Sequence, residues 1–279
     1  MSWASAYKEI ERAAAENANI SESDYIVDGL LYCGKCHTQK QTRITILGEE
    51  RTPYCLCKCE EERRAREDEL ARRRDVARRV EKLRKHGFSD ADMREWTFAN
   101  DDHKNESLMR TAQLFVDNFA KMQEAGKGLL MYGGVGVGKT YAAASIANAL
   151  VDKGIPCMVT NMSRLINAIG GMFEDKQEYI DSLNVFELLV IDDLATERDT
   201  GYVNEIVYNI IDSRYRSGKP TIITTNLTGA ELRSTEIKKQ RIYSRLLEMC
   251  IPVKCEGADR RKEKSKSDFE QYSTMLGLL

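Results

Sequence analysis

The sequence predicts an α/β domain built on a parallel sheet, preceded by a small cysteine-rich module. After residue 88, short runs rich in Ile, Val and Leu alternate with helical patterns. These runs show little polar alternation, which is typical of parallel strands buried on both faces. A glycine-rich pattern follows the first run, and five of the 8 cysteines fall between residues 33 and 59. Together these observations predict two structural parts of different kinds.

Length and charge restrict the possibilities further. The 279 residues suffice for one large domain or two smaller ones. With 42 basic and 44 acidic residues, the net charge gives no argument for or against nucleic-acid binding. The chain has no apolar run of about 18 residues. Residues 1–5 lack the basic and apolar segments of a signal peptide, so we expect a cytoplasmic protein without a membrane partner.

The first part of the chain, residues 1–59, is expected to hold a helix and a metal-stapled module. Ala4, Tyr7 and Ile10 follow a loose helical period, which predicts helical character over residues 1–30. The cysteines follow this stretch directly.

The cysteine spacing indicates zinc. Cys33–Cys36 is a C-x-x-C knuckle, and Cys55–Cys59 follows after 18 intervening residues. Two such groups can close a tetrahedral four-thiolate site, which also stabilises a segment too small for its own core. Cys55 is then the spare thiol, and the alternatives are a role for His37, disulfides, or reduced buried thiols. The favoured zinc ligands are Cys33, Cys36, Cys57 and Cys59.

A charged helix is predicted next. The stretch 60–86 contains 11 basic and 8 acidic residues, often four apart with the acid first, which stabilises an exposed helix ending at Gly87. One interpretation is a solvated linker, and the other is an arm that binds a partner or nucleic acid. The expected divisions are residues 1–59, a linker at 60–94, and an ATPase-like domain at 95–279.

The globular part begins with an amphipathic helix expected over Met109–Met122. A further helix is expected over Thr140–Leu150. Three cysteines in the apolar runs, Cys157, Cys250 and Cys255, are expected in the core. The predicted strands are Gly128–Tyr132, Pro156–Thr160, Glu187–Ile191, Pro220–Thr225 and Cys250–Cys255.

Residues 133–140 fit the pattern G-x-x-x-x-G-K-[ST] of a phosphate-binding loop. Glycines let backbone amides approach phosphate oxygens, Lys139 places a charge on the β/γ phosphates, and Thr140 ligates Mg²⁺. The alternative is a chance glycine-rich turn, but the strand before and the helix after favour the loop. The expected nucleotide contacts are Gly133, Gly134, Val135, Gly136, Val137, Gly138, Lys139, Thr140 and Tyr141.

Polar residues end two further strands. Asp192 is expected to hold Mg²⁺, and Asp193 to orient or activate the attacking water. The alternative for this pair is a strand-end turn. Asn226 follows a later strand and is placed to reach the γ-phosphate or its water, unless it or Thr228 caps a helix.

Arg241 and Arg245 share one face of a helix predicted over residues 241–248. They are either surface arginines or candidates for an arginine finger, which neutralises charge in the transition state of a neighbouring subunit.

Taken together, residues 95–255 resemble the AAA+ ATPases of the bacterial and phage replicative helicase loaders of the DnaC/DnaI type. The IstB-type transposition helper ATPases are similar over the same span. The stretch Ile210–Tyr215 followed by Gly218–Thr221 is more specific than the shared ATPase motifs. The resemblance rests on Trp96–Phe98, Gly133–Thr140, Leu189–Leu194, Asn209–Tyr215, Thr224–Asn226 and Arg241–Leu246.

The resemblance implies a P-loop AAA+ core with a five-stranded parallel sheet and ATP at its C-terminal edge. It implies that Asn226 is the sensor asparagine and Arg245 the finger, with Arg241 in reserve, acting across a self-associated assembly. It also implies ATP-dependent loading of a hexameric replicative helicase onto single-stranded DNA in replication initiation. Several such loaders carry a similar zinc module, which implies contact with helicase or DNA. The alternatives are an IstB-type transposition helper and a nucleotide-gated adaptor with little hydrolysis.

Two further expectations concern rate and DNA. Many relatives of this class carry Asp-Glu where this chain has Asp192-Asp193. Because the shorter carboxylate sits further from the water, we expect slow hydrolysis of ATP to ADP. The candidate DNA contacts are Arg164, Met172–Phe173, Lys176 and the basic run 260–266, with a solvated surface as the alternative for each.

Overall fold

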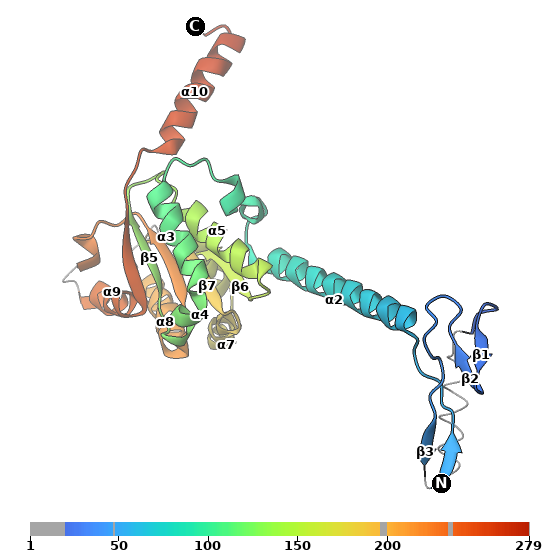
Figure 1. Cartoon of the computed structure of the whole chain (residues 1–279). Helices are drawn as coiled ribbons and strands as arrows, with labels where there is room; N and C mark the ends of the chain where they lie inside the picture. The colour runs from blue at the N-terminus through green and yellow to red at the C-terminus, as the bar shows by residue number, and fades with distance from the viewer. Residues whose placement is uncertain (1–19, 47, 196–199, 234–236, 279) are drawn as a thin grey trace. The chain divides into compact units, whose positions relative to one another are not determined.

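The computed structural model describes residues 20–46, 48–195, 200–233 and 237–278 (Figure 1). The chain divides into two compact units, Met1–Ala77 and Arg78–Leu279. The division falls inside helix α2 (Lys58–Gly87), within the stretch expected as a linker. The helical expectation for residues 1–19 lies outside the described residues.

Two short hairpins form the described start of the first unit. β1 (Tyr25–Val27) pairs antiparallel with β2 (Leu30–Tyr32), and β3 (Ile44–Ile46) pairs antiparallel with β4 (Glu49–Arg51). The expectation of helix up to residue 30 is therefore wrong for Tyr25–Val27. Asp28 and Gly29 both have positive φ angles, 50° and 76°, as a two-residue hairpin turn requires. This turn and the β-branched residues before it favour strands over helix.

Helix α2 confirms the exposed charged helix predicted from the sequence. It runs for 30 residues and, as expected, ends at Gly87. Glu69 and Arg73 form an ion pair of 2.7 Å, and Arg63 pairs with both Glu60 and Glu67. Such pairs on an exposed helix each contribute little to stability, because water screens both charges.

The second unit is built on one five-stranded sheet, in the order β6-β7-β8-β5-β9. All four neighbouring pairs are parallel, which confirms the predicted fold class. The strands coincide with the five predicted runs to within three residues at their ends. They are β5 (Gly128–Gly133), β6 (Cys157–Asn161), β7 (Leu188–Leu194), β8 (Thr221–Thr225) and β9 (Cys250–Cys255).

The strands are covered on both faces, as their apolar composition predicted. Leu129 and Met131 pack in one hydrophobic cluster with α3 and α5, whereas Leu130 between them packs in a second cluster with α6, α8 and α9. Cys157, Cys250 and Cys255 are buried, as expected. The helices are α3 (Glu106–Asp117), α4 (Phe119–Glu124), α5 (Lys139–Asp152), α6 (Met162–Gly170), α7 (Lys176–Ser182), α8 (Gly201–Ser217), α9 (Ile237–Met249) and α10 (Arg260–Met275), with 3₁₀ turns η1 (Asp92–Glu95), η2 (Phe98–Asn100), η3 (Leu183–Val185) and η4 (Glu231–Arg233).

The helix expected over Met109–Met122 is in fact two helices, α3 and α4. Asn118 separates them with φ −104° and ψ 14°, outside the helical region. Its side-chain amide donates to the Leu114 carbonyl at 2.9 Å, and this local bond competes with continuation of the helix. The apolar periodicity alone does not detect such a break.

A buried arginine, Arg214, forms hydrogen bonds with residues at the beginnings of both β7 and β8. Arg214 on α8 is 1% exposed and donates to Thr221 Oγ1 at 3.0 Å. It also donates to the carbonyls of Phe186, Glu187 and Pro220 at 2.8–3.2 Å. These bonds explain why the motif around residues 210–221 combines an arginine with a strand start.

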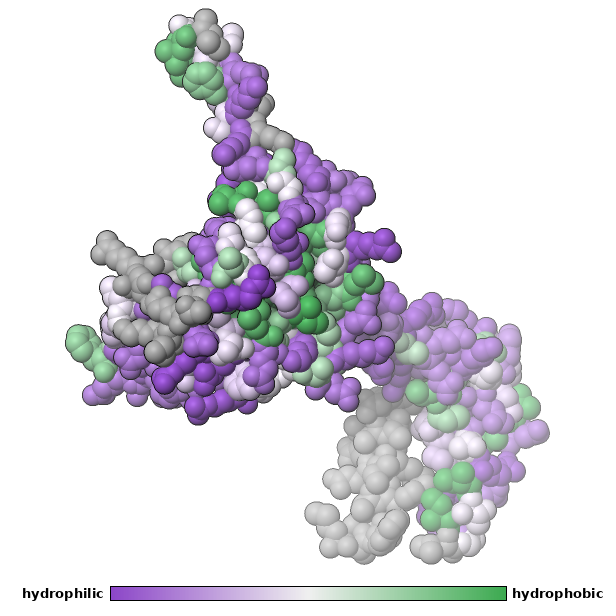
Figure 2. All heavy atoms as spheres, turned by 90° about the vertical axis from the view of Figure 1, so that its left-hand side faces the viewer, coloured by the Kyte–Doolittle hydropathy of each residue, from purple (hydrophilic) through white to green (hydrophobic). Residues whose placement is uncertain are grey.

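Within the described residues, no helix is long and apolar enough to cross a membrane. The surface view in Figure 2 is mostly hydrophilic, but apolar side chains gather at the C-terminal end of α10. This group contains the exposed side chains of Met275, Leu276 and Leu278.

Candidate functional sites

The glycine-rich loop connects β5 to α5 at the carboxyl edge of the sheet. Gly136 and Gly138 have φ angles of 74° and 98°, a region that side chains rarely adopt. Gly138 is also the residue before the first turn of α5, so the amides of that turn point toward the loop. The loop thus has the backbone of an anion-binding site.

Lys139 supplies the charge of this site. Its Nζ donates to the carbonyls of Gly133 at 3.0 Å and Gly134 at 2.6 Å, and to Asn226 Oδ1 at 2.8 Å. The side chain is buried, and this burial lowers the pKa of Lys139. A buried ammonium surrounded by three neutral oxygens is well suited to accept a phosphate in exchange.

The acidic pair lies at an irregular point of β7, next to β8. The sequence predicts an apolar run over Glu187–Ile191 in a strand that ends in these two carboxylates. In the structure β7 continues to Leu194, and its register with β8 shifts between Ile191 and Leu194. Asp193 has a φ angle of 54°, and its N–H donates to Thr224 Oγ1 at 3.0 Å. This bulge lets adjacent carboxylates sit at one sheet edge in different surroundings.

Asp192 is the buried member of the pair. The hydroxyl of Thr224 donates to its Oδ1. Burial raises the pKa of Asp192, and hydrogen bonds from the hydroxyls of Thr224 and Thr140 act in the opposite direction. Asp192 and Thr140, the two residues expected to hold Mg²⁺, are thus in contact. Two neighbouring oxygen ligands are the donor set that Mg²⁺ prefers.

Asn226 and Thr228 differ in their surroundings, which bears on the two roles expected here: reaching the γ-phosphate or its water, and capping a helix. Asn226 faces Lys139, whereas Thr228 accepts through Oγ1 a bond from the Glu231 amide at 3.3 Å, at the start of η4. The capping alternative therefore holds for Thr228.

The two candidate finger arginines differ in their surroundings. Arg245 Nε lies 2.8 Å from Asp212 Oδ1, and Nη2 donates to the Tyr208 hydroxyl at 2.9 Å. Its guanidinium also lies over the rings of Tyr208 and Tyr215, at 4.8 and 5.8 Å. Arg241, one turn earlier on α9, is exposed. Arg245 is held within its own subunit, and Arg241 faces solvent.

Arg260 contacts the glycine-rich loop, which the sequence pattern does not predict. The basic run near the C-terminus was considered for DNA, yet it begins at the phosphate loop. The Arg260 amide donates to the Gly136 carbonyl at 3.2 Å, and its Nη1 lies 2.9 Å from Asp102 Oδ1. Asp259, which caps α10 by accepting from the Arg261 amide at 3.1 Å, could have signalled a helix start here.

Tyr141 anchors the segment before α3. Its hydroxyl donates to the Thr97 carbonyl at 2.8 Å, and its ring stacks on Trp96 with centroids 5.8 Å apart. Burial raises the pKa of the Tyr141 hydroxyl. The residue was expected to contact nucleotide, and this geometry ties it to the Trp96–Phe98 motif.

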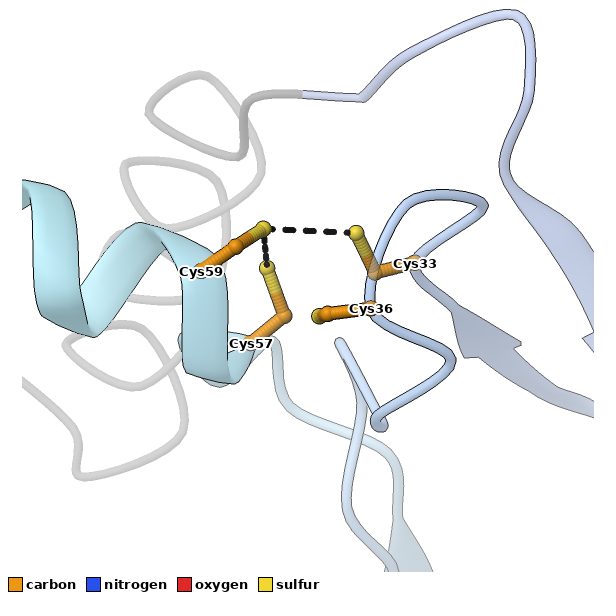
Figure 3. Close-up of side chains that lie close together, drawn as sticks. All are labelled: Cys33, Cys36, Cys57 and Cys59. Atoms are coloured by element: carbon orange, nitrogen blue, oxygen red, sulfur yellow. Dashed lines mark hydrogen bonds between the residues drawn. The ribbon is translucent and has the colours of Figure 1, made fainter.

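In the first unit, the four favoured cysteines lie together (Figure 3). The Sγ atom of Cys59 is 3.6 Å from that of Cys33 and 3.4 Å from that of Cys57, and all four sulfurs are within 4.8 Å of one another. A tetrahedral zinc with bonds of about 2.3 Å requires sulfur separations of about 3.8 Å. Cys55 is exposed, and its Sγ points to the Gln39 carbonyl at 3.6 Å. The donor set therefore fits zinc, with Cys33, Cys36, Cys57 and Cys59 as its members.

The surroundings of the C-x-x-C knuckle favour the thiolate forms of its two cysteines, Cys33 and Cys36. Backbone amides from Cys36 and Lys35 lower the pKa of Cys33, against its burial. The Thr38 hydroxyl, 3.1 Å from Cys36 Sγ, lowers the pKa of Cys36 to about 5. Thr38 Oγ1 also accepts from the Lys58 amide at 3.0 Å, which connects the two halves of the cluster.

Two curated relatives match the chain. The replicative helicase loader DnaI of Bacillus subtilis is 26% identical over 207 residues, 69% of this chain and 67% of that protein. An ATP-binding protein of an insertion sequence in Mycobacterium tuberculosis is 29% identical over 167 residues, 58% of this chain and 63% of that protein. The chain thus spans about two thirds of the length of these relatives.

Among solved structures, a crystal structure of DnaI superimposes with a TM-score of 0.51 at 24% identity, over 63% of this chain and 98% of that one. This likeness confirms the fold. The family described as IstB-like ATP binding protein matches residues 57–267, about three quarters of the chain. The chain therefore belongs to the family of IstB-like ATP-binding proteins.

Proposed function

We propose that this protein is an ATP-dependent loader that places the replicative DNA helicase on single-stranded DNA during initiation of cytoplasmic DNA replication. One observation carries the proposal: Lys139, Asp192 and Asn226 converge at one sheet edge, in a chain related to a helicase loader. The divisions at residues 1–59, 60–94 and 95–279 serve as metal module, linker and ATPase.

Each residue at the sheet edge has a proposed role. The loop amides of Gly133–Thr140 and the first turn of α5 bind the phosphates, and Lys139 pairs with the β/γ oxygens. Thr140 and Asp192 hold Mg²⁺, which supplies charge neutralisation on the phosphates when bound. Asn226 orients the γ-phosphate or its water.

Asp193 is the proposed residue that orients or activates the attacking water. Its backbone is fixed by the bond to Thr224, so its side chain departs from a defined point of the bulge. An aspartate in this position reaches about one methylene less than a glutamate. Slow hydrolysis follows, which suits a switch that reports nucleotide state.

Hydrolysis is proposed to require a second copy of the chain. Arg245 is the proposed finger and Arg241 the reserve, acting on the γ-phosphate of the neighbouring subunit. In the single chain, Arg245 pairs with Asp212, so it has to exchange this partner on assembly. Such an exchange makes activity depend on self-association.

Single-stranded DNA is proposed to bind near the loop between α6 and α7. Phe173 is fully exposed there, and Lys176 Nζ lies 5.5 Å from the ring centroid of Tyr202. Exposed aromatic rings beside lysine are suited to base stacking and phosphate pairing. Arg164 is a weaker candidate, because it already pairs with Asp90.

The zinc module is the proposed contact to helicase or DNA, and it separates the two main alternatives. The family match begins at residue 57 and so excludes Cys33 and Cys36. A transposition helper, favoured by the insertion-sequence relative, is not expected to need this module. The third interpretation is an adaptor that binds ATP and scarcely hydrolyses it.

A pull-down of the full chain from its native replication extract tests the proposal. We expect a hexameric replicative helicase in the eluate. Purified helicase is then mixed with the chain, ATP and circular single-stranded DNA coated with single-strand-binding protein. Helicase bound to the circles should rise with the wild type and stay at background with Lys139→Ala. Recovery of a transposase instead, or loading that is equal with both proteins, refutes the proposal.

A further inference from the structure

Asp24 is a buried carboxylate beside the cysteine cluster. Its side chain is only 1% exposed, and it accepts three hydrogen bonds. The donors are the Ser21 amide at 2.8 Å, the Gly34 amide at 3.0 Å and Lys40 Nζ at 2.5 Å. A carboxylate this enclosed is satisfied entirely by groups of the module.

One of these donors belongs to the first metal knuckle. Gly34 follows Cys33 directly, and a Cβ at Gly34 would lie 2.0 Å from the Ser23 carbonyl oxygen. The knuckle is therefore pressed against the turn that carries Asp24. The bond from the Gly34 amide to Asp24 fixes how the knuckle presents Cys33 and Cys36.

Lys40, the charged donor among the three, lies between the two halves of the cluster. Its amide donates to the Leu31 carbonyl at 2.7 Å, and its own carbonyl accepts from the Cys55 amide at 2.8 Å. Its side chain is 12% exposed and lines the same cavity as Cys33, Cys57 and Cys59. The ammonium that donates to Asp24 therefore belongs to a side chain on the same cavity as three of the four favoured ligands.

We propose that Asp24 and Lys40 are positioning residues of the metal site. Asp24 holds the first knuckle in its ligating conformation, and Lys40 offsets part of the negative charge of the four thiolates. The inference rests on the proposed zinc site. Four thiolates with one zinc ion carry a net charge of about −2, which a neighbouring ammonium stabilises.

A purely structural role predicts a different outcome. A buried ion pair is weak support for stability, since its desolvation cost offsets its attraction. A pair that serves the metal should instead change the affinity for metal. Partners that orient ligands typically change metal affinity by about 10–100-fold.

The experiment titrates the full, reduced, metal-free chain with Co²⁺ and then with Zn²⁺ in competition with a chelator. The variants are Asp24→Asn, Lys40→Met, their double mutant and the conservative Lys40→Arg. Matched controls are Asp28→Asn, an exposed acid in the adjacent turn, and Lys35→Met, an exposed cation inside the knuckle.

We expect each single variant to bind Zn²⁺ at least tenfold more weakly, and the double mutant to bind more weakly than either, because the two side chains act on the site in different ways. The controls and Lys40→Arg should stay within threefold of wild type. At saturating Co²⁺, the thiolate charge-transfer band should match wild type, which shows that the four-thiolate site still forms.

The outcomes are separable. Failure of the wild type to bind one Co²⁺ with that band refutes the proposed zinc site itself. If the wild type binds Co²⁺ with that band, and Asp24→Asn and Lys40→Met bind metal as tightly as the wild type, the zinc site stands and only this inference is overturned. A double mutant that binds no more weakly than the worse single variant also overturns it, because one of the two residues then has no role of its own. Lys40→Met could lack the thiolate charge-transfer band even at saturating Co²⁺. In that case, a wild-type band in Lys40→Arg supports the role of a cation beside Asp24, and a missing band in Lys40→Arg overturns the inference.

Discussion

The ammonium of Lys139 donates to Asn226 Oδ1 at 2.8 Å, which joins the first turn of α5 to the end of β8. The same ammonium also bonds the carbonyls of Gly133 and Gly134. A phosphate that enters the loop has to take over part of this set. We therefore expect Lys139 and Asn226 to respond to the same phosphate.

Lys139→Ala should abolish ATP binding or weaken it at least tenfold, a loss of about 1.4 kcal/mol or more. The variant removes the charge that the loop places on the β/γ phosphates. Equilibrium binding of a fluorescent ATP analogue measures the effect. Lys121→Ala, an exposed lysine on α4, is the control and should bind as wild type does. Unchanged binding by Lys139→Ala would refute the phosphate-loop assignment.

Asp193 is predicted to set the rate of hydrolysis without setting ATP affinity. Asp193→Ala should lower turnover at least tenfold with ATP affinity kept within threefold, because the side chain acts on the water and not on the phosphates. Asp193→Glu should raise turnover above wild type, since the longer side chain approaches the water. Equal turnover in wild type and Asp193→Ala would support the adaptor alternative, and a wild-type rate of tens per second would exclude a slow switch.

The finger assignment is tested by comparing Arg245→Ala with Arg241→Ala. Arg245→Ala should remove hydrolysis and keep nucleotide binding, because the charge acts only across the assembled interface. Since Arg245 also pairs with Asp212 and Tyr208, thermal unfolding of both variants has to be measured alongside turnover. If Arg241→Ala loses hydrolysis and Arg245→Ala keeps normal activity, Arg241 is the finger and the assignment to Arg245 is wrong.

The sequence predicted the sheet well because its strands are continuous apolar runs, whose position does not depend on distant residues. Leu129, Leu130 and Met131 illustrate this, as any buried strand needs apolar residues on both faces. The cysteine set was also predictable, since ligand spacing is a local property. The strands and the cysteine set were therefore predictable because both depend on local sequence patterns.

The features that were missed depend on tertiary contacts. The break at Asn118 arises from one side-chain bond, and the bulge at Asp193 arises from a register shift against β8. Arg260 belongs to no local pattern that connects it to the phosphate loop. Its place at Gly136 follows from the pairing of β9 with β5, which brings the chain after Cys255 to the end of the strand that precedes the loop.

Arg214 is predicted to be a major source of stability in the second unit. Arg214→Met removes the donors to Thr221 Oγ1 and to three backbone carbonyls, so the free energy of unfolding should fall by about 3 kcal/mol. Denaturant unfolding of the full chain measures it. Arg216→Met is the matched control: Arg216 is 76% exposed and pairs with Asp212, so its loss should cost less than about 1 kcal/mol. Equal effects of the two variants would contradict the buried role.

Metal removal should unfold the first unit and leave the second intact. Among the described residues of the first unit, the buried apolar side chains are Leu30, Cys33 and Cys57, too few to form a core without the metal. A zinc chelator should therefore raise the rate of proteolysis within residues 20–57 at least tenfold, while ATP affinity stays unchanged. Cys57→Ser should behave like the chelated protein, and Cys55→Ser, the spare thiol, like wild type. Equal protease resistance with and without chelator would show that the module folds independently of zinc.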